Sequence, residues 1–491
     1  MKHKGLVSIF KTFSPAEIDL FGRFINAPYH RSERKLKTFC QTFTEFYPDF
    51  TSENFNDRYI FGRIHPEKEY DEKHADQLIR MLSSELTSLA EKFLFHLNII
   101  KDPVEYKLKL VEEESGRGLH KLAAKNIDTA ISEIDSCNLD AKLFNGLEKL
   151  YKFKQEHEYK ITDSPAYIKS IDKESENFLY YIMSKASELI QSINSEEYDF
   201  NAGLVANKLL KFFRSINYDA LLYDLNFYNG ENNRLFKMYL YLLKMLSGNV
   251  DSISFNEFQK LYKYNRRLLS RSEKYNLYLM SMSLCGKLKC CSDGNFMCAC
   301  FDMHKNILNE NAYKPNDSGY MSERVYRAIV LAASLEKDTV FAEDFIQNYT
   351  VELPPESRGT MYNFAKANIN FCIGNYEEAI EYLSTISNGL QQLKYDVKCL
   401  LLKIYYELNY TQDFNYIHDS FRQFLKNNST VSESKRTKYL NFINCLCELM
   451  KLKEGRSLKP AEFLKKEISE ISEIAHKAWL MEKAALIGCK V

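Results

Sequence analysis

Glycine and proline are scarce in this chain, and their scarcity restricts its possible folds more than any other feature. Only 17 Gly and 10 Pro occur among 491 residues, so long windows contain no residue that breaks a helix. Within these windows apolar residues recur every three or four positions, which is the helical period. The patterns predict an all-α fold whose helices turn apolar stripes toward the core. Two such stripes are Leu82, Leu86, Leu89, Phe93 and Leu97, and Phe178, Ile182, Ala186, Leu189 and Ile193.

Short turns rich in Gly, Asn, Asp or Pro divide the helices at intervals that suit helical hairpins. Examples are Ser292–Asn295, Pro354-Pro355 and Gly374-Asn375. A single hairpin cannot bury its apolar face alone, so consecutive hairpins from about Pro103 onward are expected to stack into an α-solenoid. The segment Asn233–Ser247 is apolar over most of its circumference, and we expect other helices to cover it on several sides.

One part of the sequence repeats. Segment 375–383 follows Gly374 and contains Ala379, a small residue suited to burial where two helices cross. Asn409-Tyr410 repeats Asn375-Tyr376 after 34 residues, although Asp413 stands at the position of Ala379. The pattern resembles the turn and second helix of a tetratricopeptide repeat, which has a 34-residue period. This resemblance implies a right-handed α-solenoid of stacked helix hairpins. The whole chain is also similar to uncharacterised bacterial helical-repeat proteins of this length, a resemblance that implies no activity.

The sequence predicts three domains. Residues 1–102 are expected to form a small helical domain, 103–319 irregular helical-hairpin repeats, and 320–491 tetratricopeptide-like repeats with C-terminal capping helices. The first domain begins with a capping box, Ser14-Pro15-Ala16-Glu17, which has proline at the first helical position. Asp102-Pro103 is expected to end its last helix.

The first domain also resembles, in one segment, the winged helix-turn-helix of bacterial transcriptional activators. The segment consists of 61–66, a short loop, and the leucine-rich stretch from Leu78. Its charge argues against DNA binding, because residues 51–100 contain nine acidic and six basic side chains. Phosphate contacts normally dominate the affinity for DNA. A domain that docks on the solenoid or caps it is therefore the favoured interpretation.

Charge and cysteine content indicate a protein of the cytoplasm. The chain has 66 Lys+Arg and 66 Asp+Glu, which excludes a polybasic nucleic-acid binder and an acidic disordered chain. No segment has the pattern of a signal peptide or the roughly 18 apolar residues of a membrane span. Twelve cysteines lack the spacing of a secreted disulfide framework. A cytoplasmic location without a membrane span is predicted.

Five basic residues between 260 and 274 are spaced by three or four positions, which would place them on one face of a single helix. Such a stripe could bind phosphate backbones, acidic peptides or anionic lipid. The alternative is a solvated outer face whose long side chains cover apolar surface. The five residues are Lys260, Lys263, Arg267, Arg271 and Lys274.

A cluster of cysteines with one histidine raises the question of a zinc site, which needs four converging thiolate or imidazole ligands. No Cys-x-x-Cys pair is present, so burial of the cysteines as small apolar side chains is the favoured interpretation, and no metal is predicted. Redox sensing by the adjacent pair Cys290-Cys291 is a further alternative. The cluster consists of Cys285, Cys290, Cys291, Cys298, Cys300 and His304.

Motifs of common enzymes are absent from the sequence. It has no phosphate-cradling Gly-x-x-x-x-Gly-Lys-Ser/Thr, no His-Glu-x-x-His and no Gly-x-Ser-x-Gly. A glycine-poor helical repeat also offers few loops on which catalytic groups could be placed. We therefore predict that the protein is not an enzyme, that it has no catalytic residues and that it needs no cofactor.

Binding is the remaining class of function. Stacked hairpins form a groove lined by the first helix of each pair. A cytoplasmic scaffold that holds a protein or peptide in this groove is the first hypothesis. The alternative is a regulator that binds nucleic acid through the basic stripe or the helix-turn-helix-like domain, although the charge balance disfavours nucleic acid. The residues predicted to line the groove are Phe364, Asn368, Phe371, Tyr395, Leu402 and Tyr405.

Overall fold

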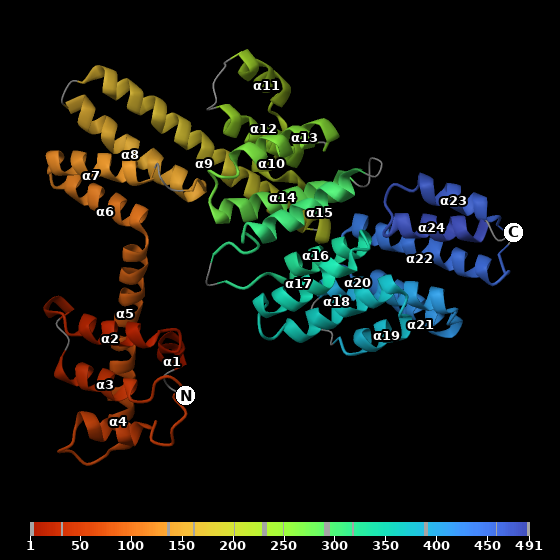
Figure 1. Ribbon diagram of the computed structural model, residues 1–491. Coiled ribbons are helices and arrows are strands. Elements are labelled where there is room, and N and C mark those ends of the chain that lie inside the picture. Colours follow the sequence, from red (N-terminus) through yellow and green to blue (C-terminus); the bar gives the residue numbers. More distant parts are fainter. Residues whose placement is uncertain are drawn as a thin grey trace. The chain divides into compact units, whose positions relative to one another are not determined.

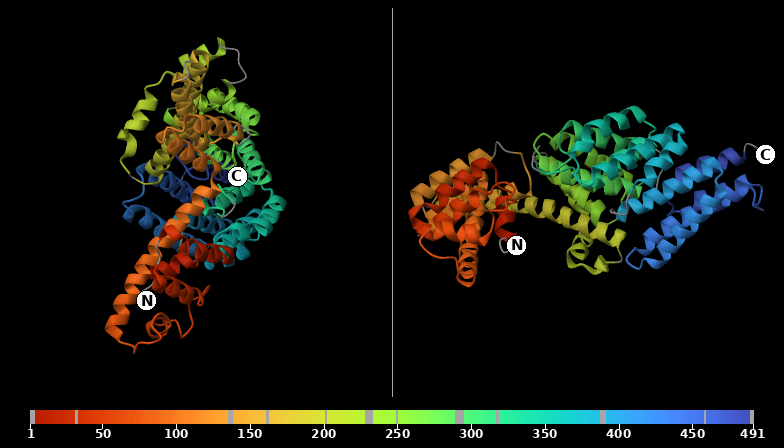
Figure 2. Two further views of the ribbon diagram at one scale, coloured as in Figure 1. Left: turned by 90° about the vertical axis from the view of Figure 1, so that its left-hand side faces the viewer. Right: turned by 90° about the horizontal axis from the view of Figure 1, so that it is seen from below.

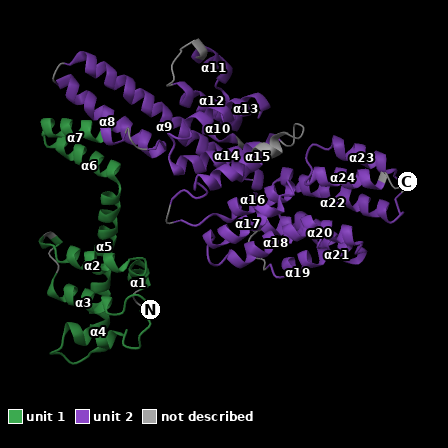
Figure 3. Cartoon of the chain, in the orientation of Figure 1, with its two compact units in different colours: residues 1–131 green, residues 132–491 purple. Residues whose placement is uncertain are grey.

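A computed structural model gives the fold of this chain (Figure 1). It describes residues 4–30, 33–134, 138–160, 163–200, 202–227, 233–248, 250–288, 295–316, 319–386, 391–457 and 459–488. Within these ranges there are 24 α-helices and no strand, which confirms the predicted all-α class. The chain divides into two compact units, residues 1–131 and 132–491 (Figure 3). The domain boundaries predicted at 102 and 319 remain predictions.

Unit 1 is built around a core of phenylalanine side chains. The predicted capping box is present at the start of α2, because Ser14 and Glu17 each bond the other's backbone N–H. Phe10, Phe21 and Phe43 are fully buried, and the rings of Phe21 and Phe43 both meet Phe10 edge to face. No strand occurs among the described residues of this unit, so the expected resemblance to a winged motif lacks its wing there. The helices are α1 Lys4–Phe10, α2 Pro15–Ile25, α3 Arg34–Thr44, α4 Asp57–Ile64, α5 Glu72–Lys101, α6 Pro103–Gly116 and α7 His120–Ile134, which ends just beyond the boundary.

Unit 2 begins with two antiparallel helices of 20 and 36 residues, and its later helices have 7 to 21 residues (Figures 1 and 2). Its first helices are α8 Ala141–Lys160, α9 Ser164–Asp199, α10 Lys208–Arg214, α11 Tyr218–Phe227, α12 Asn233–Ser247, α13 Ser252–Asn265, α14 Arg271–Leu288 and α15 Asn295–Asn309. They are followed by α16 Glu323–Leu335, α17 Thr339–Tyr349, α18 Arg358–Ile373, α19 Tyr376–Ser384, α20 Gln391–Leu408, α21 Thr411–Asn427, α22 Glu433–Lys453, α23 Ala461–Glu470 and α24 Lys477–Gly488.

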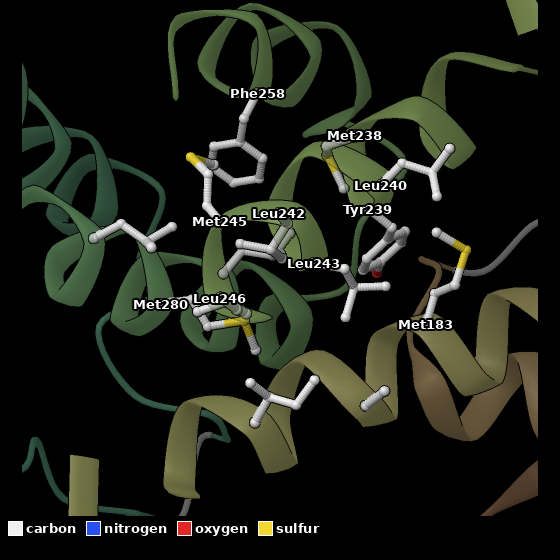
Figure 4. Close-up of a cluster of buried hydrophobic side chains, with 14 of the residues drawn as sticks. Met183, Met238, Tyr239, Leu240, Leu242, Leu243, Met245, Leu246, Phe258 and Met280 are labelled. Carbon is white, nitrogen blue, oxygen red and sulfur yellow. The ribbon is translucent and has the colours of Figure 1, made fainter. Parts of the chain in front are cut away.

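Helix α12 lies at the centre of the largest apolar cluster, as its sequence predicts. Met238, Tyr239, Leu242 and Met245 are each completely buried, although they point in different directions around the helix (Figure 4). Helices α9, α10, α11 and α13 all contact it. Its polar Lys244 reaches out of the cluster and forms an ion pair of 2.7 Å with Asp219 on α11.

Helix α9 buries only part of the stripe that its sequence predicts, since Ala186 is 4% exposed and Ile182 and Ile193 pack against the core. Phe178 and Leu189 are 50% and 44% exposed, so the prediction that this stripe faces the core is wrong for them. The face turned inward is rich in small polar residues, which allow α8, α12 and α14 to approach closely. A buried carboxylate on α14 explains one of these residues, because Ser184 donates a hydrogen bond to Glu273. The buried polar residues of α9 are Ser170, Asn177, Ser184 and Ser187.

Three consecutive hairpins in the second half of unit 2 turn in the same way. In each, a residue one or two positions after the first helix has a positive φ, and the next N–H bonds the carbonyl five residues earlier, which is the Schellman motif. The bonds are Asp338 N to Ala333 O at 3.0 Å, Asn375 N to Asn370 O at 2.9 Å, and Tyr410 N to Tyr405 O at 3.0 Å. The residues with positive φ are Lys337, Gly374 and Asn409.

The shared turn fixes the register of these hairpins. Five residues after each left-handed residue comes a buried side chain where the second helix crosses the first: Ala342, Ala379 and Phe414. Phe414 therefore corresponds to Ala379, and Asp413 is exposed. The 34-residue sequence alignment is one residue out of structural register, since Gly374 and Asn409 lie 35 residues apart.

Candidate binding site

The six side chains predicted to line a groove lie on α18 and α20, and four of them are buried. For these four the prediction is wrong, because α18 and α20 pack against the helices before and after them and their apolar sides form core. Phe371 and Tyr405 are half-buried and keep some exposed surface. The buried four, each at most 6% exposed, are Phe364, Asn368, Tyr395 and Leu402.

The predicted basic stripe does not lie on one helix. Helix α13 ends at Asn265 and α14 begins at Arg271, so a turn interrupts the spacing on which the prediction depends. Carboxylates also neutralise part of the charge: Lys274 pairs with Glu310 at 3.2 Å. Lys260 and Lys263 are on α13, Arg267 is in the turn, and Arg271 and Lys274 are on α14.

The cysteine cluster is described only in part. Cys290 and Cys291 lie outside the described residues, and so does the side chain of Cys298. Cys285 and Cys300 are buried free thiols. His304 is buried too, and its Nδ1 lies 2.6 Å from the hydroxyl of Tyr278. Among the described residues, no three His, Cys, Asp or Glu side chains form a group that could hold a metal ion.

A different group of side chains gathers where the first helices of the later hairpins meet. We call it the first-helix cluster, and its centre is an ion pair between α16 and α20. The guanidinium of Arg327 bonds both carboxylate oxygens of Asp396, with Nη2 to Oδ1 at 2.7 Å. Burial lowers the pKa of Arg327, but the charge of Asp396 outweighs this and raises it overall. The cluster consists of Arg327, Asp396, Lys403, Lys438, Tyr439 and His476.

Lys403 lies two turns beyond Asp396 on α20. Its ammonium is 4.7 Å from the ring centre of Phe371 on α18 and 6.0 Å from that of Trp479 on α24. No carboxylate of the described residues lies within 4.0 Å of it. Burial lowers the pKa of Lys403, because these apolar surroundings disfavour its charged form.

His476 lies beside Lys438, immediately before α24. Its backbone has a positive φ of 53°, and the neighbouring Ala475 N–H bonds the carbonyl of Lys438 at 3.2 Å. The imidazole meets Phe442 edge to face, with ring centres 5.1 Å apart. Burial lowers the pKa of His476 well below its ordinary value, and the positive charges of Lys403, Lys438 and Arg327 lower it further. The imidazole is therefore neutral near pH 7.

Tyr439 completes the cluster from α22. Its ring stacks on Tyr395, with centres 4.9 Å apart. Burial raises the pKa of Tyr439 well above its ordinary value, and the charge of Asp396 raises it further. The phenol thus keeps its proton and can donate a hydrogen bond. Tyr439, Lys403, Lys438 and His476 are all half-buried, so each is accessible to solvent in part.

The end of α9 docks next to this cluster on α22. Lys435 forms an ion pair of 2.8 Å with Asp199, and Lys438 donates to the hydroxyl of Tyr198 at 3.2 Å. Ser432 donates to the carbonyl of Tyr198, and Phe200 forms an isolated antiparallel bridge with Val431. The chain thus holds the last turn of α9 and the extended residue Phe200 here through backbone and charged contacts.

Comparisons with protein-family models, with curated proteins and with solved structures give no significant match. The fold and the site therefore define only a class: an all-helical protein with a half-buried, mainly basic cluster between its later hairpins. Within the described residues no helix is both long enough and apolar enough to cross a bilayer.

The sequence prediction named none of the six cluster residues as site residues. The signal available was the seven-residue spacing of Asp396 and Lys403, which places these two charges on one face of the helix. Arg327 and His476 lie 69 and 80 residues from Asp396 in the chain, so only the fold brings them to it. Phe371 is the one predicted groove residue that takes part, through its contact with Lys403.

Proposed function

We propose that this protein is a non-enzymatic scaffold that binds a protein or peptide on the first-helix side of unit 2. The observation that best supports the proposal is the composition of the site. Helices α16, α18, α20 and α22, the first helices of four successive hairpins, all contribute to the first-helix cluster or contact it. In a solenoid these helices line the concave surface, where partners bind.

The proposal includes a tetratricopeptide-like arrangement of α16 to α21. Its support is the turn shared by three hairpins, with a left-handed residue followed five positions later by a buried side chain. Identical turns give successive hairpins similar internal geometry, which is the requirement for regular stacking.

The segment Tyr198–Phe200 supports a peptide rather than a small molecule as the partner. Its contacts with α22 and the preceding loop combine a backbone bridge, a carbonyl hydrogen bond and an ion pair. Two of these residues are the helical end of α9 and only Phe200 is extended, and main-chain and charged contacts of this kind are also used to bind peptides. We place this binding in the cytoplasm, since the cysteines with described side chains are free thiols.

The test is quantitative capture of partners from native lysate, treated with nuclease, by the full chain. The variant Lys403→Ala/Lys438→Ala removes two cluster charges. The matched control Lys260→Ala/Lys466→Ala also removes two lysines, whose side chains are 64% and 74% exposed and form only loose surface ion pairs. Partners are identified by mass spectrometry after crosslinking.

A protein that is recovered with wild type and control but lost with Lys403→Ala/Lys438→Ala supports the proposal. Equal recovery of the partner with wild type, the control variant and Lys403→Ala/Lys438→Ala refutes the proposal for this site. Recovery of nucleic acid in the untreated lysate alone, reduced by Lys260→Ala/Lys466→Ala, favours the alternative regulator instead.

A further inference from the structure

The first-helix cluster has more positive charge than its carboxylates neutralise. Asp396 is already bonded on both oxygens by Arg327. Glu407, the next acidic residue on α20, forms an ion pair of 2.7 Å with Lys483, and both side chains are 15% exposed. Lys403 lies between these two acids and pairs with neither.

The same holds on the α22 side of the cluster. Asp199 is engaged by Lys435 at 2.8 Å. Lys438 donates a hydrogen bond to a neutral acceptor, the hydroxyl of Tyr198. An anionic oxygen would bind the ammonium more strongly than this hydroxyl does.

Among the described residues, Lys403 and Lys438 therefore have no carboxylate partner. Both lie near His476. The Lys403 ammonium is 6.0 Å from the ring centre of Trp479, three residues further along, and the carbonyl of Lys438 accepts from the N–H of Ala475 at 3.2 Å.

We infer that the first-helix cluster binds a phosphate group, held by Lys403 and Lys438 with His476, Tyr439 and the outer N–H groups of Arg327 as further donors. The inference rests on the proposed function, because it names the chemistry that the same site recognises in a partner. The phosphate is either a free ion or a monoester on that partner.

The number and kind of donors favour phosphate over a carboxylate. Arg327 uses Nε and one N–H of Nη2 for Asp396, so three of its five N–H groups remain. Two ammonium groups, a neutral imidazole N–H and a phenol add to these. None of the described residues accepts a hydrogen bond from the Tyr439 hydroxyl or the His476 ring. A dianion with several acceptor oxygens can use such a set, whereas a carboxylate offers one charge and two oxygens.

The surroundings strengthen this attraction. Phe371, Trp479 and Phe442 form apolar walls beside Lys403 and His476. Charges interact more strongly next to such walls than in open water. An anion there would also favour the charged form of Lys403, which burial otherwise disfavours.

The test is isothermal titration calorimetry of the full chain at constant ionic strength with three probes: inorganic phosphate, phenyl phosphate and benzoate. We expect saturable binding of at least one phosphate probe and weaker binding of benzoate. Lys403→Met/Lys438→Gln, which keeps much of the volume of both side chains, should weaken phosphate binding by about tenfold or more. Lys109→Ala/Lys466→Ala, at side chains that are 58% and 74% exposed and outside every predicted site, should leave it unchanged. Circular dichroism of each variant verifies that it is folded.

The probes separate the sources of the phosphate. Equal or tighter binding of phenyl phosphate indicates a monoester on the partner, and binding of inorganic phosphate alone indicates the free ion. The inference is refuted if neither phosphate binds, if benzoate binds more tightly, or if folded Lys403→Met/Lys438→Gln binds like wild type. Loss of partner capture in Lys403→Ala/Lys438→Ala without any phosphate binding would leave the scaffold intact and refute only the phosphate site. Phosphate binding at this site, together with partner capture that is unchanged in Lys403→Ala/Lys438→Ala, would refute only the scaffold.

Discussion

Replacing Tyr239 with phenylalanine removes a single hydroxyl from the core of unit 2. Tyr239 is completely buried on α12, and its hydroxyl donates to Oε1 of Glu273 on α14 at 2.5 Å. The same oxygen accepts from Ser184 on α9 at 2.9 Å, so one carboxyl joins three helices. Phenylalanine has the same shape apart from the oxygen, and the substitution leaves the apolar packing of Figure 4 unchanged.

The expected loss follows from the environment of Glu273, which is 2% exposed. A hydrogen bond between neutral groups contributes about 0.5–1.5 kcal/mol, and one to a charged group about 1.5–3 kcal/mol. Burial raises the pKa of Glu273, and the hydrogen bonds from Tyr239 and Ser184 oppose that shift. We therefore expect Tyr239→Phe to destabilise this region by about 1–3 kcal/mol. Expressed as an equilibrium constant for opening, the change is about 5- to 150-fold.

Hydrogen exchange followed by mass spectrometry measures this change in the intact protein, because it reports each segment separately. Peptides from α9, α12 and α14 should lose protection by the factor given above, and peptides from unit 1 should not change. Tyr416→Phe, at a side chain 74% exposed on α21, is the matched control. A loss of less than about twofold in α12 would contradict the claim that Glu273 depends on Tyr239.

Three further predictions use the same measurement or a simpler one. Arg327→Met should destabilise α16 and α20 by about 3–5 kcal/mol, because Asp396 is left charged and buried, and Arg327→Met/Asp396→Leu should restore most of the lost protection. Gly374→Ala should cost about 1–2 kcal/mol at a φ of 87°, whereas Gly62→Ala, in a helix with open space around it, should be neutral or slightly stabilising. Burial raises the pKa of Glu273 above its unfolded value of 4.5. The neutral form of Glu273 therefore contributes its full stability below pH 4.5, and this contribution is lost as the pH rises through the pKa of the folded state. Denaturation of Glu273→Gln should lack this pH dependence, and an unchanged profile would contradict the assignment.

The sequence predicted the fold class because helix-breaking residues are scarce throughout the chain. It also placed individual elements well: the capping box at Ser14, the break at Asp102, and the buried helix Asn233–Ser247. These features depend on a few neighbouring residues, whose effect on the backbone does not require the rest of the fold. The turn at Gly374 is another local feature, because the positive φ of 87° at this one residue is what favours glycine there.

Features that depend on packing between distant helices could not be predicted in this way. The inward face of α9 is the clearest case. Periodicity places Phe178 and Leu189 in the core, yet the buried side of the helix carries Tyr180, Met183 and Ile190 together with Ser184 and Ser187. The same reason explains the missed groove. Apolar aromatic side chains such as Phe364 suit a peptide groove and a core equally. In the structure, packing between neighbouring hairpins places Phe364 in the core.

Packing between distant helices also forms the first-helix cluster, so local patterns in the sequence did not predict it. A buried charged residue on a first helix is tolerated only where water or an opposite charge can interact with it. Arg327 forms an ion pair with Asp396, Lys483 forms one with Glu407, and Lys435 forms one with Asp199. Among the described residues these carboxylates are paired, whereas Lys403 and Lys438 have no carboxylate within 4.0 Å, although the chain as a whole has equal numbers of acidic and basic residues. Lys403 and Lys438 are 35 residues apart in the sequence, so it is the packing of α20 beside α22 that creates this local excess, and the proposed phosphate would neutralise it.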